Sequence, residues 1–70
     1  MSKQNAEDLR DKIARSGWSL RELPIRKANS NEIRAWKMIA VKKDRSLILE
    51  GTSLQLALEA VCKNLGLIGR

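Results

Sequence analysis

Lysine and arginine are the residues best suited to recognise a ligand in this 70-residue sequence, because they are concentrated in one stretch. Residues 15–45 contain nine basic and three acidic residues, whereas the rest of the chain contains five of each sign. The formal net charge of +6 therefore comes entirely from that stretch. A local excess of cations attracts polyanions, above all the phosphates of a nucleic-acid backbone.

This charge distribution predicts a small module that binds nucleic acid, either DNA or RNA, mainly through contacts to phosphate. The alternative interpretation is a solvated surface that keeps the protein soluble. The predicted binding residues lie along a basic sheet edge and on hairpin tips: Arg21, Arg26, Lys27, Arg34, Lys42, Lys43 and Arg45.

Trp18 and Trp36 are the only aromatic residues of the sequence. An exposed tryptophan beside a cation can stack on a base, and Trp36 lies between Arg34 and Lys37 in the sequence. A small protein without phenylalanine or tyrosine also needs large side chains for its core. We expect both tryptophans to belong to the core.

Residues that commonly carry catalysis are scarce. The sequence has no histidine, the usual general base and a frequent metal ligand, and it has a single cysteine, Cys62. A lone cysteine forms no internal disulfide, and without a histidine to activate it we expect a buried, inert thiol. We therefore predict a protein that is not an enzyme and has no cofactor, no metal site and no small-molecule substrate.

Cysteine usage and hydropathy predict a cytoplasmic protein that does not interact with membranes. A single cysteine suits a reducing compartment. No apolar run approaches the roughly 20 residues of a membrane span, and the polar first five residues do not resemble a signal peptide. We expect residues 1–70 to form one small domain, with residues 1–4 disordered.

Two segments have the spacing of amphipathic helices. In residues 4–16 apolar side chains recur at helical intervals, Asn5 can cap the start, and Gly17 can close the end in a left-handed conformation. A second helix follows Thr52, which forms a capping-box pattern with Gln55, and it ends at Gly66.

Three strands are predicted between these helices. The first starts after Gly17 and contains Pro24, which places it at a sheet edge. The second covers 33–42 and the third 46–50, with a turn at 43–45 between them. The expected fold is α+β in the order α-β-β-β-α, a three-stranded antiparallel meander packed against two helices, with 33–42 in the middle.

The central strand is apolar on both sides, so the register of the hairpin that follows decides which face is buried. A three-residue loop would normally contain a glycine or asparagine, which residues 43–45 lack. We therefore favour a loop of two or four residues, in which the pairing of the two strands is shifted by one position relative to a three-residue loop. The favoured register makes the following pairs: Ala40–Leu47, Met38–Leu49, Ile39–Ile48 and Lys37–Glu50.

This register predicts a core face beneath the helices, formed by Trp36, Met38, Ala40, Leu47 and Leu49. The other side of the sheet is then an aliphatic face too large to leave in water, so either a helix crosses to cover it or a partner does. A partner would make the protein an interaction module or a homodimeric small regulator, which is the second functional hypothesis. Its predicted interface residues are Ile33, Ile39, Val41 and Ile48.

Overall fold

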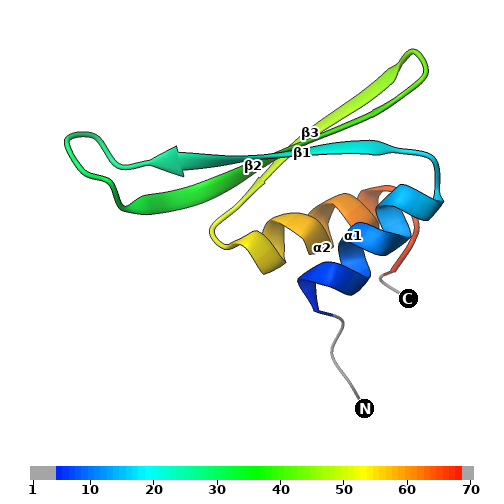
Figure 1. Ribbon diagram of the computed structural model, residues 1–70, viewed down its shortest axis with the longest axis horizontal. Helices are drawn as coiled ribbons and strands as arrows, with labels where there is room; N and C mark the ends of the chain where they lie inside the picture. The colour runs from blue at the N-terminus through cyan, green and yellow to red at the C-terminus, as the bar shows by residue number, and fades with distance from the viewer. Residues whose placement is uncertain (1–4, 69–70) are drawn as a thin grey trace.

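The computed structural model describes residues 5–68 and contains two helices and one three-stranded sheet (Figure 1). The strands are antiparallel and lie in the order β1-β2-β3, which confirms the predicted α+β fold with residues 33–42 in the middle. The prediction for residues 1–4 lies outside the described residues. The elements in chain order are α1 (Ala6–Arg15), β1 (Ser19–Arg26), β2 (Ile33–Lys42), β3 (Arg45–Gly51) and α2 (Leu54–Asn64).

Both helices pack on one face of the sheet (Figure 1). α1 lies against β1 and α2, and α2 lies against β2 and β3. Neither helix crosses to the other face, which we call the open face. The fully buried core side chains come from α1, β2 and α2, and they are Leu9, Ile13, Met38, Ala40, Ala57, Leu58, Val61 and Cys62.

The favoured hairpin register is confirmed. Ala40 pairs with Leu47 and Met38 with Leu49, so the loop between β2 and β3 consists of Lys43 and Asp44 alone. Arg45, predicted as part of the turn, is the first residue of β3. The predicted core face therefore lies beneath the helices, although three of its five residues, including Trp36, are half-buried rather than buried. A domain this small has too little surrounding structure to bury a side chain as large as an indole completely.

Pro24 lies inside β1, opposite Trp36, and β1 is an edge strand as Pro24 predicted. Near the end of this pairing the register shifts by one residue. Ile25 pairs with Ala35, but Arg26 pairs with Ile33, so one residue of β2 is extra. The alternation of side chains along β2 therefore does not extend across the shift to Ile33.

Both helices end at a glycine with a left-handed backbone, as predicted. The φ angle of Gly17 is 87° and that of Gly66 is 76°. The next amide in each case donates back to the helix, from Trp18 N to Ile13 O at 3.3 Å and from Leu67 N to the residue 62 carbonyl at 2.8 Å. These bonds satisfy carbonyl groups that a helix end leaves free and turn the chain back toward the core.

The predicted start of α2 is wrong by one residue. The cap is Ser53, whose Oγ accepts a hydrogen bond from Leu56 N at 3.1 Å, and the Gln55 side chain donates to Glu59 Oε2 at 3.0 Å. The helix starts one residue later than predicted because β3 continues through Gly51, which pairs with Trp36. A Cβ at Gly51 would lie 2.5 Å from Ala57 N, so glycine is required where α2 meets the strand.

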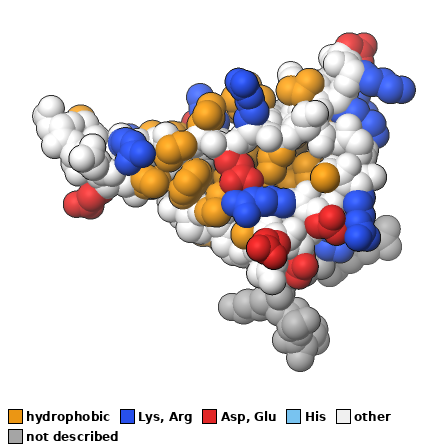
Figure 2. All heavy atoms as spheres, in the orientation of Figure 1, with side chains coloured by type: hydrophobic (Ala, Val, Ile, Leu, Met, Phe, Trp, Pro, Cys, Tyr) orange, Lys and Arg blue, Asp and Glu red, His pale blue; other side chains and the backbone are white. Residues whose placement is uncertain are grey.

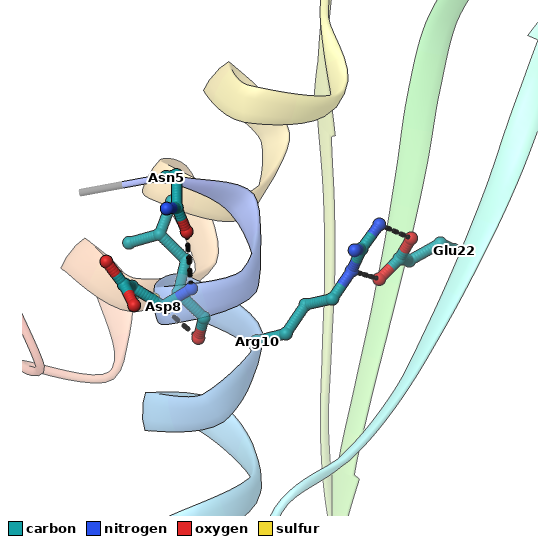
Figure 3. Close-up of polar contacts among 6 residues, drawn as sticks. Asn5, Asp8, Arg10 and Glu22 are labelled. Atoms are coloured by element: carbon teal, nitrogen blue, oxygen red, sulfur yellow. Dashed lines mark hydrogen bonds and ion pairs between the residues drawn. The ribbon is translucent and has the colours of Figure 1, made fainter. Parts of the chain in front are cut away.

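α1 is fixed to β1 by a two-point ion pair (Figure 3). Arg10 Nε donates to Glu22 Oε2 at 2.6 Å, and Nη2 donates to Oε1 at 2.8 Å. The hydrogen bond to Glu22 raises the pKa of Arg10. At the start of the helix, the Asn5 side chain accepts from Asp8 N at 2.9 Å, which confirms the predicted cap.

None of the helices in residues 5–68 is both long and apolar enough to cross a lipid bilayer.

Candidate nucleic-acid interface

Three of the predicted binding residues come together where β2 turns into β3. Lys42 and Arg45 are cross-strand partners, and Lys43 is the first of the two loop residues between them. We call these three residues the basic turn cluster. Figure 2 shows basic side chains around this end of the sheet, at the upper right of the view. Asp44 is the one acid in the loop itself.

Two members of the basic turn cluster are held by neighbours that leave their charge intact. Lys42 Nζ donates to the Ser16 carbonyl oxygen at 2.8 Å, so its ammonium group is anchored at the end of α1. The Arg45 guanidinium carbon lies 5.8 Å from the centre of the Trp18 ring, a cation–π contact. A backbone carbonyl and an aromatic ring both orient a cation without neutralising it.

No carboxylate in the described part of the chain forms an ion pair with the cluster. The ion pairs there join Arg10 to Glu22, Arg15 to Asp11 and Lys27 to Glu32. The cluster therefore presents three cations without an ion-pair partner among the described residues, of which Lys43 and Arg45 are exposed and Lys42 is half-buried, and with Asp44 the net charge of residues 42–45 is +2.

The backbone of Lys43 is in the left-handed region, with a φ of 56°. A two-residue hairpin loop needs this conformation at its first position because only such turns follow the twist of the strands. Glycine and asparagine adopt it at the lowest cost, whereas a lysine there is disfavoured by about 1 kcal/mol. The favoured register already implied this conformation, although no other feature of the sequence indicates it.

A second group of predicted residues lies at the opposite end of the sheet, around the β1–β2 connection (Figure 1). There Lys27 Nζ is paired with Glu32 Oε2 at 3.4 Å, and Arg26 Nη1 donates to the Asn31 carbonyl oxygen at 2.8 Å. Arg34 is exposed on β2. β2 has ten residues, and at about 3.3 Å per residue the two groups are about 30 Å apart.

Arg21 belongs to neither group. It lies on β1 opposite Ile39, on the open face, and is exposed. The seven predicted residues thus occupy two ends of the sheet and one position between them. The two groups are separated because they lie at opposite ends of β2, so their residues cannot belong to the same hairpin loop.

Three of the four predicted interface residues share the open face. Ile39 and Ile48 are cross-strand partners, and Val41 follows two residues later on the same side of β2. Ile33 is exposed near the β1–β2 connection, beyond the register shift. Sequence reasoning missed the contribution of β1, whose Leu23 and Ile25 extend the aliphatic surface, because it predicted a register only for β2 and β3. The alternation of apolar residues along β1 was the available signal.

Cys62 is buried, as predicted, and its thiol lies 3.6 Å from the Leu9 carbonyl oxygen. Burial raises the pKa of the Cys62 thiol, and the nearby Lys12 opposes the shift. A buried, protonated thiol is a poor nucleophile. Within residues 5–68, no group of histidine, cysteine, aspartate and glutamate side chains is arranged to hold a metal ion.

The chain matches no family model, no curated protein and no solved structure at a level that would indicate common ancestry. Its function is therefore inferred from the geometry of its own residues.

Proposed function

We propose that this protein binds nucleic acid through the basic turn cluster, with contacts to phosphate rather than to base edges. Lysine and arginine supply the charge that phosphates attract, and Arg45 adds a planar group with several donors. Lys42 and Arg45 are pre-positioned by Ser16 and Trp18, so less side-chain freedom is lost when they bind an anion.

The observation that carries this proposal is the left-handed backbone of Lys43. Folding alone favours glycine or asparagine at that position, so the lysine lowers stability where a smaller residue would raise it. Unfavourable backbone conformations are concentrated at functional sites. An exposed ammonium group at the tip of a hairpin, between two other cations, has phosphate binding as its most direct use.

The second basic group supports a polymeric ligand over a small anion. It lies about 30 Å from the basic turn cluster, a distance that one phosphate-containing metabolite does not span. One turn of duplex DNA is about 34 Å long. A nucleic acid that runs along the sheet can therefore meet both groups. In the second group, around the β1–β2 connection, Lys27 is already paired with Glu32, so we expect this group to contribute less to binding.

The dependence of binding on salt tests the proposal. Anisotropy of a short labelled DNA duplex, an RNA duplex and a single strand is measured against protein at increasing salt. Three phosphate contacts on a DNA duplex correspond to a log-log slope of about −2.7. Lys43→Glu is expected to weaken binding and flatten the slope.

Lys63→Glu is the matched control. It makes the same change in net charge, but Lys63 is exposed on α2, outside residues 15–45. We expect it to have a much smaller effect than Lys43→Glu. The proposal is wrong if no nucleic acid binds at low salt, or if the two variants weaken binding equally, because net charge alone would then explain it.

A further inference from the structure

The open face is an apolar surface with a charged pair near its middle. Ile48 is 58% exposed, Leu23 42% and Val41 41%, although all three are large hydrophobic residues. Both helices lie on the other face. Exposed aliphatic side chains that lie side by side on one face are common where proteins bind a partner. Lys37 and Glu50 are cross-strand partners on this face, yet they form no ion pair with each other or with another described residue.

We propose that a second copy of this chain covers the β2–β3 part of the open face, with a two-fold axis that lies parallel to the strands between β2 and β3. Such an axis places each residue of one strand over its cross-strand partner in the other copy. Ile39 then lies over the partner's Ile48. Lys37 lies over the partner's Glu50, and the reciprocal pair forms at the same time.

The position of the charges is what favours a second copy over an unrelated protein. A cation on β2 and an anion at the same level of β3 form a surface that is complementary to itself under this rotation. Sheets packed face to face lie about 10 Å apart, a gap that a lysine and a glutamate directed toward each other can close. Six of the other basic residues lie at the two ends of the sheet, and Arg21, which is exposed on the open face, lies on β1 outside the contact between the β2 and β3 strands.

The size of the open face predicts a weak dimer. The proposed axis superposes two strands of each copy, and two strands spaced about 4.8 Å apart over about seven residues have a projected area of roughly 220 Å² per copy, to which the side-chain surface adds. Stable interfaces bury about 1,200 Å² or more in total, so the proposed contact falls below that range. We expect a dissociation constant on the order of 100 µM. The paired charges then fix the alignment of the two copies more than they add affinity.

The first test is sedimentation of the wild type and of two matched variants across a range of concentrations. Ile48→Glu places a charge on the open face and is expected to weaken association at least about tenfold. Leu56→Glu is the control, because Leu56 is 51% exposed on α2, away from the sheet face. Circular dichroism verifies that both variants keep the fold. A wild type that stays monomeric up to about 1 mM overturns the proposal, as does equal weakening by both variants.

The second test separates contacts between copies from contacts within one copy. Lys37→Glu alone and Glu50→Lys alone each set like charges against each other in a dimer, so each variant is expected to be monomeric. Mixed together, they place two carboxylates of one chain over two ammonium groups of the other. The mixture is expected to form a heterodimer of about wild-type affinity. No association in the mixture rules out the proposed axis, whatever the single variants do.

Discussion

Arg10 of α1 and Glu22 of β1 form a bidentate ion pair, with Nε–Oε2 at 2.6 Å and Nη2–Oε1 at 2.8 Å. The pair joins a helix to the edge strand across twelve residues of sequence. α1 contributes only Leu9 and Ile13 to the fully buried core. The ion pair therefore supplements a narrow hydrophobic contact and sets the orientation of α1 on the sheet.

Replacing Arg10 with lysine should reduce stability. A lysine retains the charge but makes only one contact to the carboxylate, and both side chains are partly exposed. We expect Arg10→Lys to lower the free energy of unfolding by about 0.5 kcal/mol in a urea titration. Arg15→Lys is the control, since the Arg15–Asp11 pair is much more exposed. Equal losses for the two variants would contradict the role assigned to Arg10.

Gly51→Ala should destabilise the fold by about 2 kcal/mol. The added methyl group would overlap Ala57 N and force α2 away from β3. Gly66→Ala is the comparison, because its Cβ would meet nothing within 4 Å and the only penalty is the φ of 76°. The free energy of unfolding of Gly66→Ala should be lower than that of the wild type by about 1 kcal/mol. Urea titration of both proteins measures the difference, and a harmless Gly51→Ala would show that the contact between helix and strand is loose.

Local patterns predicted most of the fold, but contacts between distant residues escaped them. The lack of glycine and asparagine in residues 43–45 favoured a loop of two or four residues, and the opposite charges of Lys37 and Glu50 agreed with the resulting register, which the structure confirms. The cap at Ser53 was missed because Gly51 continues β3, and only the packing of Ala57 against it explains this. The partners of Lys42 and Arg45, which are Ser16 and Trp18, come from the α1–β1 junction and have no local signature.

The stability of the protein should fall above about pH 9 because of Cys62. Burial raises the pKa of its thiol, so the folded protein keeps the proton to a higher pH than the unfolded chain. The resulting stabilisation is fully present below the unfolded pKa and is lost as the pH rises through the folded one. Urea titrations of wild type and Cys62→Ala between pH 7 and pH 10 should show the gap between them narrowing at high pH. A gap that stays constant would contradict the assigned shift.

The measurement that tests the central claim most directly is the effect of Lys43→Gly on stability and on binding in the same protein. Glycine relieves the left-handed backbone at φ 56°, so the free energy of unfolding should rise by about 0.5 kcal/mol, less than the full backbone penalty because glycine also loosens the unfolded chain. Removal of the tip ammonium group should weaken binding to a nucleic-acid duplex severalfold and reduce the salt slope by about one. Lys63→Ala, which removes one charge from α2, should leave binding nearly unchanged. A Lys43→Gly protein that binds as well as the wild type would show that the lysine has no part in recognition and would contradict the proposed function.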